Sequence, residues 1–375
     1  MVNVLSYDGL GEQLTKRFNL CRYCIRRQFD VDKAVRSAES LNNCHICLGL
    51  MDRLDLVLKH IQKAVSGVYQ FDTFSIGASL PVGFAEREDQ IRARFKIRGR
   101  ESIKGQLLDE LRSRFEIISG RKVDFLLPDV SICVNVTNER EVYVKATSRH
   151  ITLAGRYTKN RRGLPQKRDK CELCRGEGCA ACSNSGLSSH DSVEYNIGRE
   201  LVRLTKSKTP IFSWVGSEDE KSLVLGRGRP FFVRLNDPKI RILKRDIILK
   251  TPEISAVIES TPKCLPISPI RFRTTTKIIV ETADMLKSGD LVKLGLLENA
   301  IIRLQHKTKT ITKKIHSIRA RKVSTNRFAL TLVADGGLPF KKFVRGDQDT
   351  SPSISEIIGR KCECILFDIL DVNLE

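Results

Sequence analysis

The sequence is poor in aromatic residues and in acidic charge. Aromatic side chains make up 6% of the 375 residues, and the 44 Asp and Glu are outnumbered by 65 Lys and Arg. So few rings disfavour a protein that binds single strands mainly by base stacking. The formal net charge of +21 instead favours contact with phosphates, so we expect a nucleic-acid partner.

Long apolar segments are missing as well. No stretch approaches the roughly 20 apolar residues that span a membrane. The first 18 residues also lack the basic-then-apolar order of a secretory signal. We therefore expect a soluble cytoplasmic protein without a membrane partner. The 41% hydrophobic content is sufficient for the cores of about two or three domains.

Cysteine, by contrast, is frequent and patterned. Eight of the twelve cysteines form four Cys-x-x-Cys pairs, and the first two pairs read Cys-x2-Cys-x19-Cys-x2-Cys. This spacing is typical of a structural zinc site. In a reducing cytosol paired cysteines bind metal more often than they form disulfides, which are the alternative. We expect one zinc ion to be bound by Cys21, Cys24, Cys44 and Cys47.

The other two pairs lie much closer together. They consist of Cys171, Cys174, Cys179 and Cys182. Only four residues separate the two pairs, so one zinc ion on all four sulfurs requires a tight loop. Gly176 and Gly178 permit such a loop. From the spacing alone, a second zinc site and a metal-free loop are equally open alternatives.

Periodicity and composition divide the chain into four segments. They are residues 1–65, a helical segment with the first cysteines; 66–155, an α+β module; 156–187, a basic Cys/Gly-rich connector; and 188–375, a strand-rich domain. Helices are predicted at Leu54–Val65 and Glu101–Ile117. Strands are predicted at Ser131–Thr137 and Glu141–Lys145, with Cys133 on the apolar side. Later predictions are strands at Arg327–Asp335 and Cys362–Val372 and a short helix at Ser353–Ile358.

Positive charge is concentrated in two tracts. Residues 156–170 carry seven Lys and Arg and one acid, and residues 306–322 carry seven and no acid. Such tracts suit phosphate contact, which supplies affinity rather than sequence choice. We expect Arg156–Lys170 and Lys307–Arg321 to line the faces of one cleft that binds nucleic acid.

The most informative motif follows residue 215. A polar loop that begins Gly216-Ser-Glu-Asp219 precedes Leu225-Gly-Arg-Gly-Arg-Pro-Phe231 and a predicted strand. Taken alone, this loop is a solvated turn. It resembles the active-site block of the archaeal and eukaryotic tRNA pseudouridine synthases that carry an N-terminal THUMP-type domain. That family has a Gly-Arg-Glu-Asp loop followed by Leu-Gly-x-Gly-Arg-Pro-Phe.

Five further blocks resemble the same family in the same order. They are the first cysteine pairs with Arg27-Gln-Phe29, then Gly155–Lys159, Arg162–Gln166, Cys171–Gly186 and Gly336–Asp347. The order makes the resemblance specific over most of the chain. It implies an α+β protein in which a zinc-stapled helical and THUMP-type domain precedes a mixed-sheet pseudouridine synthase catalytic domain.

The resemblance also implies residue roles. It assigns the catalytic carboxylate to Asp219 and a partner cation to Lys341, which would keep the carboxylate ionised. A Lys341 that only faces water at a strand edge is the alternative. The implied activity is that of an isomerase acting on T-loop uridines, at tRNA positions 54 and/or 55, without a cofactor for the chemistry. The implied substrate-binding residues are Arg229, Phe231, Arg156, Tyr157, Arg162 and Phe340.

Several positions depart from the family pattern. The family has Arg, Asp and Tyr where this sequence has Ser217, Lys221 and Pro339. Phe340 is adjacent to the missing Tyr, but in an expected strand it would point to the opposite face. These losses favour an alternative function, a non-catalytic zinc-containing tRNA-binding protein or chaperone. The retained Asp219 favours the enzyme.

Two further expectations concern partners. The substrate tRNA is the expected partner of a monomeric protein, and a helper protein that supplies the lost groups is the alternative. The stretch Cys171-x-x-Cys-x-Gly-x-Gly178 also resembles Hsp40 cysteine repeats. A protein chaperone of that kind has no use for the Asp219 block, so we prefer the enzyme.

Overall fold

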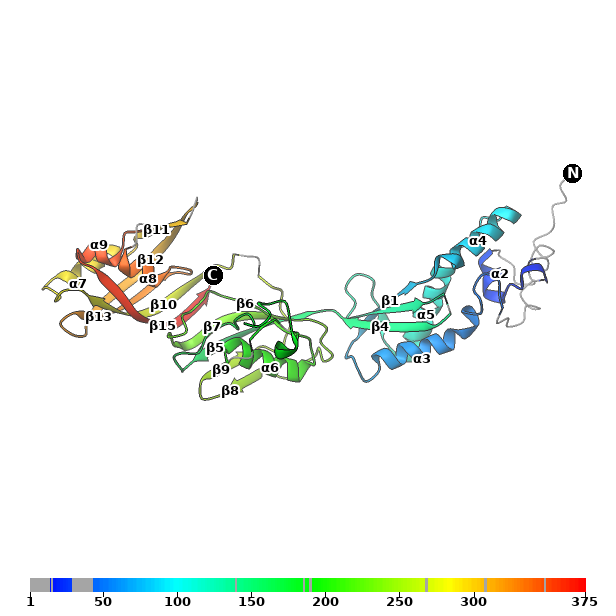
Figure 1. Cartoon of the computed structure of the whole chain (residues 1–375), viewed down its shortest axis with the longest axis horizontal. Coiled ribbons are helices and arrows are strands. Elements are labelled where there is room, and N and C mark those ends of the chain that lie inside the picture. The colour runs from blue at the N-terminus through cyan, green and yellow to red at the C-terminus, as the bar shows by residue number, and fades with distance from the viewer. Residues whose placement is uncertain are drawn as a thin grey trace. The chain divides into compact units, whose positions relative to one another are not determined.

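The computed structural model divides into two compact units (Figure 1). The first comprises residues 1–149 and 237–241, and the second comprises residues 150–236 and 242–375. The structure describes residues 14, 16–28, 43–138, 140–184, 186–188, 191–266, 269–306, 309–346 and 349–375. Parts of the first cysteine-rich segment, Phe29, Lys307 and Asp347 lie outside the described residues.

The first unit is built on a sheet of strand order β2-β1-β3-β4. The strands are β1 (Thr73–Ser79), β2 (Lys122–Val123), β3 (Val130–Val136) and β4 (Val142–Ser148). The helices are α2 (Arg22–Gln28), η1 (Met51–Arg53), α3 (Leu54–Val65), α4 (Val82–Phe95) and α5 (Ile103–Ser119). The two helices and two strands predicted in this region are therefore confirmed.

Helix α5 shows why these predictions succeed. Its apolar residues repeat at helical spacing and are buried, from Ile103 to Phe115. The Ser102 hydroxyl accepts a hydrogen bond from the backbone N–H of Gly105 and caps the start of the helix. Gly120 ends the helix with a φ of +65°, a conformation in which a side chain is unfavourable.

Strand β3 corrects one prediction, because Cys133 is exposed. The strand buries Val130, Ile132 and Val134 and turns the alternate positions outward. Cys133 shares its face of the strand with the polar residues Ser131 and Asn135, so the alternation places it outward, although cysteine is itself an apolar residue. The larger β-branched residues take the core positions.

The second unit contains a mixed sheet of strand order β14-β11-β12-β13-β10-β15-β7-β5-β9-β8, and β6 also pairs with β7. The strands are β5 (Ile151–Lys159), β6 (Ile211–Trp214), β7 (Val224–Leu235), β8 (Ile247–Lys250), β9 (Ile254–Ile258), β10 (Phe272–Thr282), β11 (Ile301–His306), β12 (Lys309–Lys322), β13 (Arg327–Asp335), β14 (Thr350–Ser351) and β15 (Cys362–Leu374). The helices are η2 (Ala180–Cys182), α6 (Val193–Thr205), α7 (Asp290–Lys293), η3 (Leu294–Leu297), α8 (Phe340–Arg345) and α9 (Ile354–Ile358). The α+β class with a mixed sheet is confirmed.

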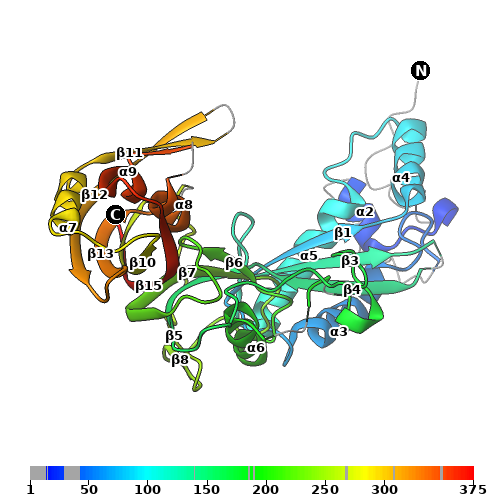
Figure 2. The ribbon, with the colours of Figure 1, turned by 60° about the vertical axis from the view of Figure 1, so that its left-hand side comes forward.

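The two halves of this sheet meet at β15. This strand pairs antiparallel with β10 on one side and parallel with β7 on the other. In Figure 2, α8 lies beside β15, and Phe343 and Val344 of α8 and Ile354 of α9 belong to the same buried core. The strands predicted at β13 and β15 and the short helix at α9 are confirmed.

Two segments differ in local structure from the expectations. The segment after Pro339 is helix α8 rather than a strand, with Pro339 just before its first turn and Gly346 just after its last. Proline fits the start of a helix and cannot donate to a strand ladder. In addition, β5 continues through the expected boundary between residues 155 and 156. The finer division of each unit stays a prediction.

Candidate active site and cysteine clusters

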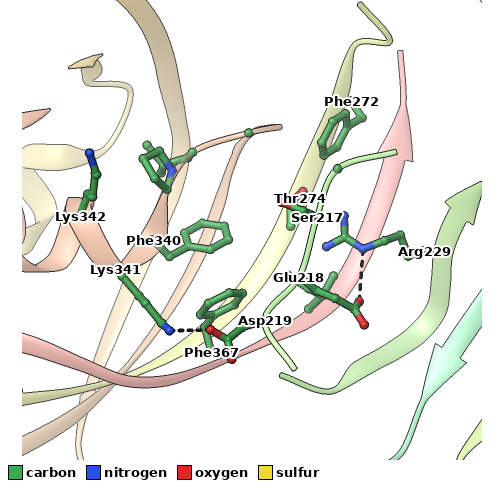
Figure 3. Close-up of a pocket in the computed structure, with 15 residues that line it drawn as sticks. Ser217, Glu218, Asp219, Arg229, Phe272, Thr274, Phe340, Lys341, Lys342 and Phe367 are labelled. Atoms are coloured by element: carbon green, nitrogen blue, oxygen red, sulfur yellow. Dashed lines mark hydrogen bonds and ion pairs between the residues drawn. The ribbon is translucent and has the colours of Figure 1, made fainter. Parts of the chain in front are cut away.

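A pocket of about 360 Å³ in the second unit contains Asp219 (Figure 3). Its walls come from segments that are distant in sequence: the loop between β6 and β7, strands β10 and β15, and the turn leading into α8. The pocket is therefore assembled only when the two halves of the sheet come together. Its described lining residues are Gly216, Ser217, Glu218, Asp219, Arg229, Phe272, Thr274, Gly337, Leu338, Pro339, Phe340, Lys341, Lys342, Phe367 and Ile369.

Asp219 and Lys341 form an ion pair inside this pocket. The Lys341 Nζ donates to Asp219 Oδ2 at 2.5 Å, and the backbone N–H of Lys221 donates to Asp219 Oδ1 at 3.0 Å. The Asp219 side chain is 25% exposed, so the carboxylate is held in place yet open to the pocket. Although Lys341 is 60% exposed, it lies on α8 and not at a strand edge.

These contacts keep the carboxylate ionised. The hydrogen bond from Lys341 is the main cause that lowers the pKa of Asp219 below its ordinary 3.8, and the Lys221 N–H acts in the same direction. Partial burial opposes this shift. Because the pKa falls, Asp219 carries its charge throughout the physiological range.

Aromatic rings line the pocket near this pair. Phe340 and Phe367 contact each other with ring centroids 5.2 Å apart, and Phe272 lies on the same side as Thr274 of β10. The Phe272 ring fits between Gly216 and Gly336, where an added Cβ would come within 2.8 Å and 2.3 Å of its carbons. Both glycines are therefore needed for this ring to lie at the pocket wall.

Glu218, the neighbour of Asp219, points into the protein interior. Its side chain is fully buried, and Oε1 lies 3.0 Å from Lys159 Nζ while Oε2 lies 3.5 Å from Arg229 Nε. The Tyr157 hydroxyl donates to Glu218 Oε2 at 2.9 Å. Burial is the main cause that raises the pKa of Tyr157 well above its ordinary value, so it stays a neutral donor. Glu218 thus holds the Asp219 loop in place through its buried contacts with Lys159, Arg229 and Tyr157.

Lys159 and Arg229 complete this buried network. Lys159 Nζ donates to the carbonyl oxygens of Leu164, Asp219 and Glu220, and Arg229 Nη1 donates to the carbonyl of Val215 at 2.7 Å. These bonds tie the start and the end of the Asp219 loop to β5 and β7. The network fixes the loop backbone, and so the direction of the catalytic candidate.

The expected substrate-binding residues fall into two groups. Arg229 and Phe340 line the pocket. Four others do not line it and have structural contacts instead. Arg156 donates to the carbonyls of Arg227, Gly228 and Val372, Tyr157 and Phe231 are buried, and Arg162 pairs with Asp368 at 2.7 Å.

Several residues of the pocket and of the buried network beside it carried no clear signal in the sequence. Phe272, Thr274 and Phe367 come from β10 and β15, whose pairing and register no local pattern reveals. Lys159 and Glu218 stood inside recognised motifs but were not assigned roles. A buried charge at the end of a strand, next to a polar loop, was the signal available for Lys159.

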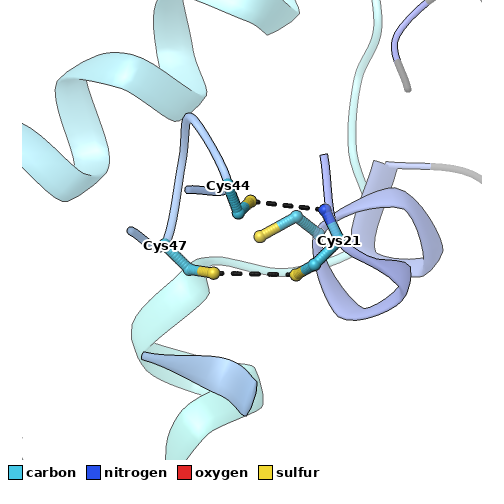
Figure 4. A group of neighbouring side chains, drawn as sticks. Cys21, Cys44 and Cys47 are labelled. Atoms are coloured by element: carbon cyan, nitrogen blue, oxygen red, sulfur yellow. Dashed lines mark hydrogen bonds between the residues drawn. The ribbon is translucent and has the colours of Figure 1, made fainter. Parts of the chain in front are cut away.

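The first four cysteines form a compact, buried cluster (Figure 4). All four sulfur atoms lie within 4.8 Å of one another, and the Cys21 and Cys47 sulfurs are 3.6 Å apart. A tetrahedral zinc with bonds of about 2.3 Å places sulfurs roughly 3.8 Å apart. Arg27, from the adjacent motif, donates to the Cys24 sulfur at 3.3 Å and pairs with buried Glu88 on α4. The donor set therefore fits a structural zinc ion.

The second four cysteines also converge. The sulfurs of Cys171 and Cys179 are 3.9 Å apart, and those of Cys174 and Cys182 are 3.8 Å apart. Gly176 and Gly178 have φ of +102° and +97°, so the tight loop uses the freedom expected of them. The backbone N–H of Cys179 is the main cause that lowers the pKa of Cys182 to about 6. This cluster also has the geometry of a metal site.

Two family models match the chain. The family model described as "Pus10, C-terminal" matches residues 152–373, and "Pus10 THUMP domain, archaeal" matches residues 58–135. Within the described part of the chain, no helix is both long and apolar enough to cross a membrane. A solved structure titled "Crystal Structure of a Cbf5-Nop10-Gar1 Complex" matches with a TM-score of 0.30 and 8% identity, over 58% of this chain and 57% of that chain. We draw no conclusion about fold or function from a similarity this low.

Curated relatives match over nearly the full length. The protein named "tRNA pseudouridine synthase Pus10" from Nitrosopumilus maritimus is 32% identical, over 98% of this chain and 98% of that protein. Proteins of the same name from Cenarchaeum symbiosum and Korarchaeum cryptofilum are 31% and 30% identical, over 89% and 88% of this chain and 82% and 93% of those proteins. With the C-terminal family model matching more than half of its length, the chain belongs to the Pus10 family.

Proposed function

We propose that this protein is an isomerase that converts T-loop uridines of tRNA to pseudouridine, with Asp219 as the catalytic carboxylate. The observation that carries the proposal is the pocket in which ionised Asp219 is held by Lys341 beside aromatic walls. The names of the Pus10 relatives supply the substrate class.

The chemistry needs few groups, and the pocket contains candidates for each. The reaction breaks the bond between N1 of uracil and C1′ of ribose, turns the base, and joins C5 to C1′. A proton leaves C5 and one is gained at N1, so the formula does not change. Asp219 acts at the sugar or at the base, while Lys341 keeps it charged. The target uridine must first leave its stack, at a cost of a few kcal/mol.

Phe272, Phe340 and Phe367 supply apolar surface for the extruded base. This surface compensates for Pro339, where the family has a Tyr. Ser217 lines the pocket in place of the family's Arg. At position 221, where the family has Asp, the backbone N–H of Lys221 donates to Asp219. Any non-proline residue provides that N–H, so this departure does not remove the contact. We therefore propose that the three departures reduce the rate of turnover and do not abolish it.

Mapping of pseudouridine in tRNA transcripts tests this proposal. Unaltered protein should form pseudouridine in the T-loop, and Asp219→Asn should form none while binding the same tRNA. Glu220→Gln is the matched control, because Glu220 is an exposed carboxylate in the same loop that does not line the pocket. If the unaltered protein binds tRNA well and forms no pseudouridine, the non-catalytic tRNA-binding alternative is correct.

We also propose that each cysteine cluster binds one structural zinc ion. The converging sulfurs support zinc, because four thiolates in a tetrahedron are its preferred structural ligands. Purified protein should contain two zinc ions per chain, and Cys21→Ser and Cys179→Ser should each remove one. Cys133→Ser is the control, because Cys133 is exposed and belongs to neither cluster. Unchanged zinc content in either cluster variant would reject that site.

A further inference from the structure

The two faces of the large sheet differ. Along β10, Thr274, Thr276 and Ile278 are buried, and Thr274 lines the catalytic pocket. Successive side chains of a strand point to opposite faces, so Lys277 and Ile279 lie on the face away from that pocket. Along β13, the buried Phe328, Leu330 and Leu332 of the core likewise alternate with Ala329 and Thr331.

A groove of about 490 Å³ opens on this opposite face. Cross-strand pairing gives its form, because Thr331 of β13 pairs with Lys277 of β10 on one side and with Arg319 of β12 on the other. Ala329 likewise lies between Ile279 and Arg321. The middle strand thus contributes a floor of short side chains. The outer strands contribute walls of long ones, two of them arginines on β12.

The charge of this groove is not neutralised. Lys277, Arg319 and Arg321 are exposed, and their side chains make no ion pair or hydrogen bond with any residue that the structure describes. Elsewhere on this face cations have partners. Arg327 pairs with Glu281 at 2.7 Å, and Asp368, which lies beside Lys277 on β15, is held by both nitrogens of the Arg162 fork.

We propose that this groove binds the phosphate backbone of RNA, at a part of the molecule other than the one that carries the target uridine. Three unpaired cations on its walls match an anionic chain. Among the described residues that line the groove, none is aromatic, so it has no platform for base stacking. The groove therefore supplies affinity without reading sequence.

The dimensions suit one nucleic-acid strand. The walls stand two strand spacings apart, roughly 10 Å, and Arg319 and Arg321 are about 7 Å apart along β12. The pocket and the groove open on opposite faces of the sheet, so we expect a short hairpin with its loop at Asp219 not to contact the groove. A full-length tRNA is long enough to reach both. Identification of the RNA as tRNA rests on the proposed function.

The test compares two RNAs and two variants of the full chain. The groove variant is Lys277→Gln/Arg319→Gln/Arg321→Gln. The control is Arg234→Gln/Arg245→Gln/Lys250→Gln, which removes the same number of arginines and lysines from exposed positions outside the groove. Affinity for a tRNA transcript and for its isolated T-arm hairpin is measured over a range of salt concentrations.

The groove variant should bind tRNA more weakly, and the slope of log K against log salt should fall in magnitude by about 2 to 3. Its affinity for the hairpin and its rate of hairpin conversion should not change, which also shows that it is folded. The proposal is overturned if tRNA binding and its slope are unchanged, if the hairpin loses as much affinity as tRNA, or if the control matches the groove variant. Because affinity is the readout, weaker tRNA binding without any pseudouridine supports the groove and rejects the proposed function.

Discussion

Glu218 and Asp219 are adjacent in the chain and both belong to the pocket wall, yet the Glu218 side chain is fully buried whereas that of Asp219 is 25% exposed. Asp219 faces the pocket and accepts hydrogen bonds from the exposed Lys341 and from the backbone N–H of Lys221. Glu218 lies in the interior beneath the loop, fully buried between Lys159 and Arg229. The chemistry of the two carboxylates is the same, so the difference in surroundings decides their roles. An exposed, ionised carboxylate can react, whereas a buried one orients its neighbour.

The largest effect is expected from Asp219→Asn, which should lower activity and leave stability nearly unchanged. Asp219→Asn removes the charge of the proposed catalytic carboxylate, so the single-turnover rate should fall on the order of 10⁴-fold, about 5.5 kcal/mol in barrier height. The free energy of unfolding should change by less than about 1 kcal/mol, because the pair with Lys341 is exposed. The assignment of different roles to Asp219 and Glu218 is wrong if this variant keeps full activity or unfolds far more easily than the unaltered protein.

The buried region should show the reverse pattern. Glu218→Gln keeps the side-chain volume but leaves Lys159 and Arg229 buried without a counter-charge. Loss of one partner of a buried pair costs about 3–5 kcal/mol, so chemical denaturation should show a loss of this size. Any decrease in activity should then be smaller than for Asp219→Asn. Equal stability of the two variants would contradict the assignment of Glu218 as an anchor.

A smaller effect is expected at Lys341. Lys341→Met removes the cation that lowers the Asp219 pKa, so that pKa should rise towards 3.8. In the proposed mechanism the active form is the ionised carboxylate, so activity should be lost as pH falls through the folded-state pKa of Asp219. The acid limb of the rate profile should therefore move to higher pH, with a loss of about tenfold in rate near neutrality from poorer positioning. An unmoved acid limb would show that Lys341 does not set this pKa.

The smallest effect is expected at Tyr157. Tyr157→Phe deletes the hydroxyl that donates to Glu218 and accepts from Gln166. The free energy of unfolding should fall by about 1 kcal/mol, the usual contribution of one hydrogen bond. Because the ring stays in the core, the acid limb of the rate profile should not move. A shifted acid limb, measured beside Lys341→Met, would place Tyr157 in the pocket chemistry instead.

The sequence predicted what depends on local pattern. Helix α3, helix α5 and strand β13 follow from apolar spacing, and the convergence of Cys21, Cys24, Cys44 and Cys47 follows from their paired Cys-x-x-Cys spacing. For the second cysteine group the spacing left a metal site and a metal-free loop open, and the structure brings its four sulfurs together. Asp219 and Lys341 were named from motifs, and the structure places them in contact. That part of the site needed only short segments to be recognised.

What could not be predicted depends on distant segments. Arg156 and Arg162 looked like RNA contacts, yet Arg156 donates to backbone carbonyls and Arg162 to Asp368, which is 206 positions away. Phe272 and Phe367 reach the pocket through the pairing of β10 with β15. Motif spacing contains no information about such register. For the same reason, the sequence did not show that the basic residues of β12 point to two opposite faces of the sheet.

The central position of β15 has a consequence for the order of folding. The strands on its two sides, β10 and β7, are both synthesised earlier, and each brings part of the pocket. Neither half-sheet can close the pocket until β15 has entered between them. Such late, long-range pairing predicts a slow final folding step. On the ribosome, the Asp219 loop should therefore stay without its β10 and α8 walls until residues 362–374 have emerged, which delays catalytic competence to the end of this sheet's assembly.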